Sequence, residues 1–197
     1  MTVILDYGMG NLRSVERAVR HLGFDCVIQP HLKGARRLIL PGVGAFGAAM
    51  QRLEPLSGEI GAFVADGSPL LGICLGQQLL FQESEEHGRS TGLSLLPGTV
   101  RYLPPDRGLK VPHIGWNGLV PSFESRLMKG VAEGEAVYFV HSLYTACADP
   151  SDVAAEAEYI VPFAAAVERE NVFGVQFHPE KSGETGLKIL RNFLQCS

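Results

Sequence analysis

Cysteine is scarce in this sequence of 197 residues, which contains only Cys26, Cys74, Cys147 and Cys196 and no CxxC pair. That spacing excludes a disulfide-rich secreted scaffold and argues against a zinc ribbon. The chain also lacks a basic leader followed by an apolar stretch, and no uninterrupted apolar run reaches the roughly 18 residues that span a membrane. We therefore expect a protein of the reducing cytoplasm, with no metal and no membrane partner.

Charged residues are few as well. They make up 19% of the chain, and the formal net charge is −4, which gives no general reason to expect a nucleic-acid partner. Apolar residues account for 46%, a value that excludes intrinsic disorder. The chain shows no internal repeat and no linker, and single domains run to roughly 250 residues. We expect one domain over residues 1–197.

The pattern of apolar segments changes between the two halves of the chain. In the first half we expect strands at 2–6, 24–28, 37–40 and 69–73, and helices from 11 to 22 and at 44–53, 60–65 and 75–83. In the second half we expect strands at 99–103, 136–140, 163–168 and 172–177, and a final helix at 184–195. Alternating strands and helices predict βαβ units. The fold class is therefore α/β, a mainly parallel twisted sheet flanked by helices, with an antiparallel extension.

Residues 69–78, PLLGICLGQQ, contain the most informative motif. A short apolar strand enters Gly-x-Cys-x-Gly and a helix follows, which is the nucleophile-elbow pattern with sulfur in place of a serine oxygen. Glycine at 72 and 76 removes collisions that side chains would make around such a strained turn. The pattern predicts Cys74 as a nucleophile at a helix start, with the Leu75 amide facing an oxyanion.

A base for this nucleophile is predicted from residues 174–180, GVQFHPE. Residues two apart on a strand project to the same side, so His178 and Glu180 are expected to face one way at the strand end that Pro179 imposes. His178 would take the thiol proton, and Glu180 would fix the imidazole tautomer. His113 and His141 are the main rival histidines, since each lies among aromatic residues.

Residues 40–47, LPGVGAFG, form a glycine-rich stretch without the ending of a phosphate loop. Gly42-x-Gly44 also lacks the third glycine of a dinucleotide motif. The stretch therefore gives little support to ATP or NAD, and we expect no cofactor. A loop that brings main-chain amides close to a reacting carbonyl fits this composition better.

These motifs resemble the class I (triad) glutamine amidotransferases. The resemblance covers nearly the whole chain, and it is closest to those members that act as glutaminase subunits of imidazole glycerol phosphate synthase. The segments that carry it are DYGMGNL (6–12), LPGVGAF (40–46), GICLGQQ (72–78), VPHIGWN (111–117), YFVHS (138–142) and residues 174–182. It implies hydrolysis of glutamine to glutamate and ammonia by a class I amidotransferase fold.

The resemblance also implies roles for individual residues. Cys74, His178 and Glu180 match the catalytic triad. The matching oxyanion and glutamine-pocket positions are Val43, Leu75, Gly42, Gly44, Gln78, Ser142 and Leu143. Leu143 departs from the family pattern, which commonly has an aromatic residue there, and Ile114 replaces a commoner methionine.

In the family, the ammonia passes to a HisF-type (β/α)8 cyclase subunit, which makes imidazole glycerol phosphate and the aminoimidazole carboxamide ribonucleotide in histidine biosynthesis. The resemblance thus implies a heterodimer, with Asn11, Trp116 and Lys181 at the partner face. From the residues alone, Trp116 is expected in the core, Lys181 in solvent and Asn11 at a helix N-cap.

Three other functions remain open from the sequence. The first is the glutaminase subunit of another synthase, of the anthranilate or aminodeoxychorismate type, against which the HIGWN segment argues. The second is a cysteine peptidase or γ-glutamyl hydrolase without a synthase partner. The third is a non-catalytic binding module on the same fold.

Overall fold

The computed structural model describes residues 1–105, 108–122 and 124–196. The α-helices of this part are α1 (Leu12–His21), α2 (Phe46–Ala65), α3 (Leu75–Leu79) and α4 (Gly183–Leu194), with 3-10 helices η1 (Pro150–Asp152) and η2 (Pro179–Lys181). The strands of the first half are β1 (Thr2–Leu5), β2 (Cys26–Gln29), β3 (Arg37–Gly42), β4 (Leu70–Cys74), β5 (Phe81–Ser84), β6 (Ser90–Thr91) and β7 (Leu96–Tyr102). Those of the second half are β8 (His113–Gly118), β9 (Val120–Pro121), β10 (Ala136–His141), β11 (Leu143–Cys147), β12 (Val153–Tyr159), β13 (Val161–Arg169) and β14 (Val172–Val175).

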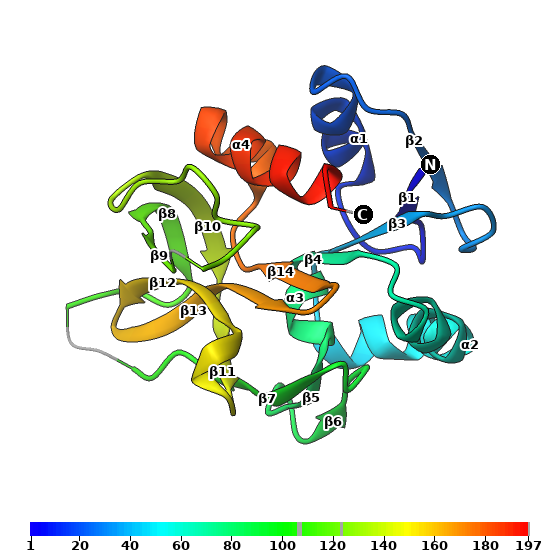
Figure 1. Cartoon of the computed structure of the whole chain (residues 1–197). Coiled ribbons are helices and arrows are strands. Elements are labelled where there is room, and N and C mark those ends of the chain that lie inside the picture. Colours follow the sequence, from blue (N-terminus) through cyan, green and yellow to red (C-terminus); the bar gives the residue numbers. More distant parts are fainter. Residues whose placement is uncertain (106–107, 123, 197) are drawn as a thin grey trace.

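The largest sheet within the described residues has the strand order β2-β1-β3-β4-β14-β13-β12-β9 (Figure 1). From β2 to β14 the neighbouring strands are parallel. From β14 to β9 they are antiparallel. This order confirms the predicted α/β class, with a parallel sheet from the first half and an antiparallel extension from the second.

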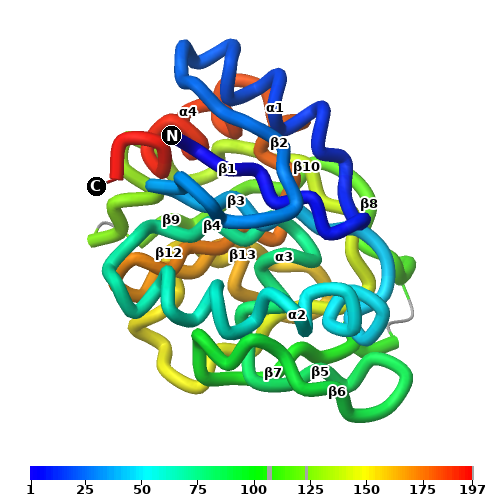
Figure 2. Tube along the Cα trace, turned by 90° about the vertical axis from the view of Figure 1, so that its right-hand side faces the viewer, coloured from blue at the N-terminus to red at the C-terminus, as the bar shows by residue number. Residues whose placement is uncertain are grey.

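Helices cover both faces of the parallel part of the sheet. Figure 2 shows α1 and α4 on one side and α2 with α3 on the other. Alternate residues of β1 divide accordingly, because Ile4 packs with Val19 and Phe193 while Val3 and Leu5 belong to the opposite core. Burial on both faces explains the uninterrupted apolar runs of these strands. The helices leave the carboxyl ends of the parallel strands uncovered.

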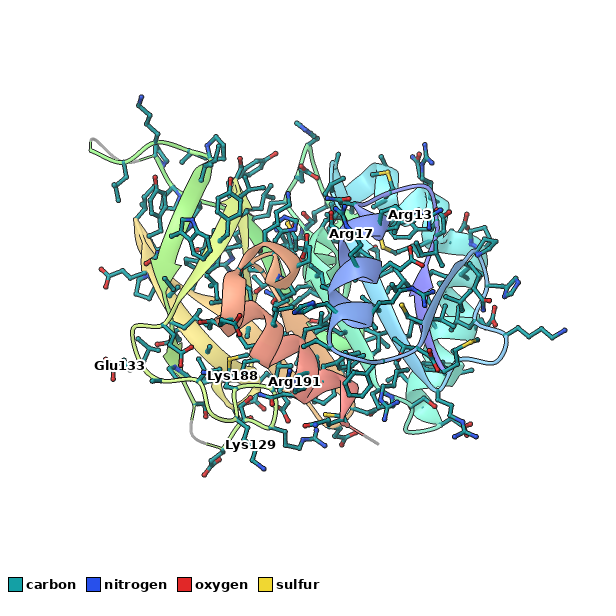
Figure 3. The ribbon with its side chains drawn as sticks, turned by 90° about the horizontal axis from the view of Figure 1, so that it is seen from above. Arg13, Arg17, Lys129, Glu133, Lys188 and Arg191 are labelled. Atoms are coloured by element: carbon teal, nitrogen blue, oxygen red, sulfur yellow. The ribbon has the colours of Figure 1, made fainter. Side chains whose placement is uncertain are left out.

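The outer surface of the α1–α4 layer is polar. Figure 3 looks onto it, with Arg13 and Arg17 on α1 and Lys188 and Arg191 on α4. Arg13, Arg17 and Arg191 are exposed, whereas Val15, Val19, Ile189 and Phe193 of the same helices are buried. This division gives each helix one apolar face for the sheet.

Two smaller sheets flank the large one. The antiparallel pair β10-β8 extends from Ala136↔Gly118 to His141↔His113. A second sheet has the order β11-β7-β5-β6, in which β5 and β7 are parallel and the other pairs antiparallel. Both sheets border the strand ends where the site lies.

The structure differs from the sequence prediction at one pair of expected helices, because tertiary contacts join them. The two helices expected at 44–53 and 60–65 are one helix, α2, which continues through Pro55. A proline inside a helix costs about 3 kcal/mol. The apolar stripe of Phe46, Ala49, Leu53 and Ile60 packs on the sheet from both sides of the proline, and its burial offsets that cost.

Among the other boundaries that differ from the prediction, two lie next to the site, the end of one helix and the end of one strand. The helix expected at 75–83 ends at Leu79, because the carbonyls of Leu79 and Leu80 accept hydrogen bonds from Leu93 and Leu95 and residues 81–84 form β5. The strand expected to end at residue 40 runs to Gly42. Its pairing with β1 ends at Ile39, so beyond that point the strand pairs only with β4 and tolerates a proline.

Within the described residues, no helix is both long and apolar enough to cross a membrane.

The turn after β4 provides a stability test. A Cβ on Gly76 would lie 1.8 Å from the Leu40 carbonyl oxygen, which is backbone and cannot move aside. Gly76→Ala is therefore expected to lower the free energy of unfolding by about 3 kcal/mol or more. The control is Gly61→Ala in α2, whose Cβ would have no neighbour within 4 Å and which is expected to gain up to about 1 kcal/mol. Chemical denaturation measures both, and equal stability of the two variants would contradict the packing argument.

Candidate active site

Cys74 lies at the turn between β4 and α3 in an unusual backbone conformation. Its φ is 56° and its ψ −111°, although it carries a side chain. Gly72 and Gly76 allow this turn, since a Cβ on Gly72 would lie 2.5 Å from the Gly76 carbonyl oxygen. The strained strand-to-helix turn predicted from the sequence is confirmed. Strain of this kind, of order 1–3 kcal/mol, concentrates at functional sites.

The neighbouring strand brings His178 to the same edge. β14 is parallel to β4, with Gly174 opposite Gly72 and Val175 opposite Ile73, so the two chains leave the sheet side by side. The strand ends at Val175 and not at 177 as expected. His178 is the N-cap of η2, and its backbone N–H donates to the Tyr138 carbonyl at 3.0 Å.

Glu180 contacts the histidine from within η2. The His178 Nδ1 lies 2.9 Å from Glu180 Oε1, and their side chains are 4% and 1% exposed. Alternation along a strand was the wrong reason for this pairing, because the two residues meet through a 3-10 turn. The contact leaves Nδ1 occupied, while Nε2 has no hydrogen-bond partner within the described part of the chain.

The surroundings of His178 favour its charged form. Burial lowers the pKa of the ring, but interactions with Cys74 and Glu180 outweigh it and raise the pKa to about 10. An imidazolium beside a cysteine stabilises the thiolate, which is the reactive form of sulfur. The geometry therefore brings together a cysteine, a histidine and a carboxylate that can act as nucleophile, proton carrier and orienting group.

Cys74 and His178 share a cavity of about 250 Å³. Its lining residues are Val43, Gly44, Cys74, Leu75, Gln78, Glu86, Pro112, Val140, His141, Ser142, Leu143 and His178. The cavity thus brings together eight of the ten residues expected in the triad, oxyanion loop and glutamine pocket. The other two lie behind it: Glu180 contacts His178, and Gly42 is opposite Cys74 in the pairing of β3 with β4.

A family model described as glutamine amidotransferase class-I matches residues 3–196. This chain belongs to the class I glutamine amidotransferases.

Curated relatives narrow the group within the family. The amidotransferase is 50% identical to imidazole glycerol phosphate synthase subunit HisH of Methanothermobacter thermautotrophicus, covering 99% of this chain and 98% of that protein. It is 48% identical to the subunit of the same name from Aquifex aeolicus, covering 98% and 95%. These relatives place it among the HisH subunits.

Solved structures agree with the fold. A crystal structure titled glutamine amidotransferase matches with a TM-score of 0.77 at 21% identity, over 98% of this chain and 97% of that one. PurLQS from Thermotoga maritima matches with a TM-score of 0.76 at 21% identity, over 98% and 96%. At this identity the likeness concerns the fold alone.

Of the two rival histidines of the amidotransferase, the one that lines the cavity has both ring nitrogens engaged. His141 lines the cavity, but its Nδ1 lies 2.8 Å from the Leu143 carbonyl oxygen and its Nε2 lies 3.0 Å from His113 Nδ1. His113 is stacked on Tyr159 at 3.9 Å between ring centroids. Burial lowers the pKa of each histidine to about 4. The pair is therefore neutral and structural.

Sequence reasoning missed an acidic residue of the cavity. Glu86 follows β5, and its Oε2 accepts a hydrogen bond from the Phe46 backbone N–H at the start of α2. The only local signal was the acidic run 83–86, which is indistinguishable from a solvated turn. Its position in the cavity depends on the meeting of α2 and the β5 loop.

The residues expected at the partner face lie at the surface. Trp116 and Ile114 on β8 are 59% and 60% exposed, so the expectation of Trp116 in the core is wrong. Lys181 and Asn11 are exposed as well. Asn11 occupies the N-cap position of α1, yet its side chain makes no capping hydrogen bond within the described residues.

The pKa of His178 provides a test of the site. Glu180→Gln keeps an acceptor for Nδ1 but removes the charge, so it is expected to lower the pKa of His178, as followed by NMR titration of the ring. In the wild type the folded-state pKa, about 10, lies above the ordinary value of 6.5. The contacts of the charged ring with Cys74 and Glu180 therefore stabilise the fold fully below about pH 6.5, and this stabilisation is lost as the pH rises toward 10. An identical ring titration in the variant would contradict the assigned contact.

Proposed function

We propose that the cavity hydrolyses glutamine to glutamate and ammonia, with Cys74 as nucleophile, His178 as acid and base, and Glu180 as its orienter. One observation supports this above all others. One small cavity is lined by both Cys74, which lies on a strained turn, and His178. The Nδ1 of His178 contacts the Glu180 carboxylate, and its Nε2 has no hydrogen-bond partner among the described residues. This is the arrangement that covalent acyl transfer requires.

The reaction proceeds in two steps. The Cys74 thiolate attacks the side-chain amide carbon of glutamine, and His178 gives its proton to the nitrogen, which leaves as ammonia. The product of this step is a γ-glutamyl thioester. His178 then takes a proton from water, the hydroxide attacks the thioester carbon, and glutamate leaves as the sulfur regains its negative charge.

Main-chain amides stabilise the oxyanion of both steps in this proposal. The candidates are the amides of Leu75, which follows the nucleophile, and Val43, which follows β3. Gly44, next to Val43, has a φ of +101°, so this loop adopts a backbone conformation that suits glycine. Loss of one such donor typically costs about 10²- to 10³-fold in turnover.

The remaining cavity residues are proposed to recognise glutamine. Glu86 is the acidic side chain of the lining and would attract the substrate α-ammonium. Gln78, Ser142 and Leu143 also line the cavity, and their hydrogen-bonding groups would contact the substrate amide and carboxylate. A volume of about 250 Å³ falls just below the roughly 300–1,000 Å³ of drug-sized pockets, which favours a single amino acid over a peptide.

Substitution of the nucleophile tests the reaction. Cys74→Ala removes the sulfur and adds no bulk, so it is expected to abolish glutamine hydrolysis while the protein stays folded. Glutamate release measures turnover, and circular dichroism checks the fold. Cys147→Ala, which changes another thiol, serves as the control and should retain activity. Turnover in Cys74→Ala would remove Cys74 from the mechanism.

We further propose that the ammonia passes to a HisF-type (β/α)8 cyclase subunit bound as a heterodimer, as the names of the relatives imply. Free ammonia is lost to water unless the site is covered. The exposed apolar side chains of Trp116 and Ile114 lie on β8, whose neighbour β10 holds the His178 backbone through Tyr138. An apolar face beside the site suits a partner that collects the product.

The partner face is tested by Trp116→Ala. Aromatic residues at interface centres commonly contribute about 2 kcal/mol or more, so the affinity for the cyclase subunit is expected to fall by about 30-fold or more. Isothermal titration with the cyclase measures it. Phe24→Ala is the control, because Phe24 precedes β2, an edge strand of the large sheet, whereas Trp116 lies on β8 of the two-stranded sheet. Equal affinity of wild type and Trp116→Ala would exclude Trp116 from the interface.

A further inference from the structure

Gln176 lies beside the nucleophile without reaching the cavity. It follows β14 directly, and its backbone N–H donates to the Ala165 carbonyl at 2.8 Å. The side chain is completely buried, and its Nε2 lies 3.8 Å from the Cys74 sulfur. The cavity lining does not include it. A fully buried amide directed at a nucleophilic atom has a function other than contact with substrate.

The orientation of this amide is determined by a neighbouring carbonyl. The Leu143 carbonyl oxygen can only accept hydrogen bonds, and it accepts one from Gln78 Nε2 at 3.2 Å. The same Gln78 Nε2 lies 2.9 Å from Gln176 Oε1. Because Gln78 must present its nitrogen to Leu143, it also presents a donor to Gln176. Gln176 therefore directs its oxygen at Gln78 and its nitrogen at the sulfur.

We propose that Gln176 is a positioning residue for Cys74, whose amide N–H donates to the sulfur and stabilises it as a thiolate. Hydrogen bonds to charged acceptors are stronger than those to neutral ones, so the bond favours the charged sulfur over the thiol. Formation of the thioester removes the charge, and the bond weakens only after attack has occurred.

The proposal rests on Cys74 being the nucleophile, so the test measures the reactivity of the Cys74 sulfur and not the turnover of glutamine. Iodoacetamide alkylation of Cys74 is followed by mass spectrometry across a pH series, which separates Cys74 from the three other free thiols. The variants are Gln176→Met, which removes the donor at similar volume, and Gln176→Glu, which keeps the acceptor for Gln78 but places a carboxylate oxygen beside the sulfur.

Loss of the donor is expected to move the midpoint of the alkylation profile upward by about one pH unit in Gln176→Met, the size expected for one hydrogen bond to a charged group. Gln176→Glu is expected to move it further, because a negative charge opposes the thiolate. Gln77→Met is the matched control. Gln77 is equally buried and donates to Thr145 Oγ1 at 2.9 Å, so its loss destabilises the fold without changing the sulfur.

Unchanged midpoints in folded Gln176 variants, or an equal shift in Gln77→Met, would overturn the proposal. If the Gln176 variants do not fold, the wild type decides the question. The side-chain NH₂ signal of Gln176 in ¹⁵N NMR is expected to move over the pH range in which Cys74 becomes alkylatable, and to stay constant in Cys74→Ala. A signal that is constant in both proteins would refute the bond.

The two hypotheses fail in different ways. Inactivity of Cys74→Ala together with unchanged Gln176 profiles would refute the positioning role alone. Full activity of Cys74→Ala would refute the proposed function, whatever the alkylation profiles show.

Discussion

The left-handed backbone of Cys74 is the constraint on which the site depends. An L-residue at φ 56° is unfavourable by order 1–3 kcal/mol, so the surrounding sheet must hold it there. β4 is buried along its length between β3 and β14, and Gly72 and Gly76 pack directly against backbone. The same turn ends the strand, starts α3 and places the sulfur on the cavity and against Gln176. A side chain at either glycine would disturb all of these at once.

Strand order explains why residues a hundred positions apart form one site. β14 is the parallel neighbour of β4, so the chain that follows it leaves the sheet beside Cys74. His178 is then held from three directions, by Tyr138 of β10, by Ser182 and by Glu180. The pair β8–β10 thus accepts the His178 backbone N–H through Tyr138 of β10 and presents exposed apolar side chains on β8. A single small sheet joins the candidate active site to the proposed partner face.

Local patterns predicted the elements whose ends are decided locally. The apolar stripe of α1, with Gly23 just beyond it at φ +83°, and the run of β4 into its glycine turn were correct. The errors occurred where distant groups compete for the backbone. α3 is short because Leu93 and Leu95 take the carbonyls that a longer helix would use, and α2 passes Pro55 because the sheet buries residues on both sides of it. The exposure of Trp116 was likewise decided by tertiary packing, because Trp116 and Ile114 lie on the uncovered face of β8 while His113 on the other face is buried.

The order of residue types along the chain was enough to determine the α/β class, the elbow at Cys74 and the candidates His178 and Glu180, because turn chemistry and periodicity act over a few residues. Only the tertiary structure decided how these groups meet. It showed that His178 and Glu180 pair through a 3-10 turn, that His113 and His141 contact each other through their ring nitrogens, and that Glu86 lines the cavity. It also placed the Gln176 amide against the sulfur. Such contacts depend on which strands become neighbours, and that is a property of the packed sheet and not of any short segment.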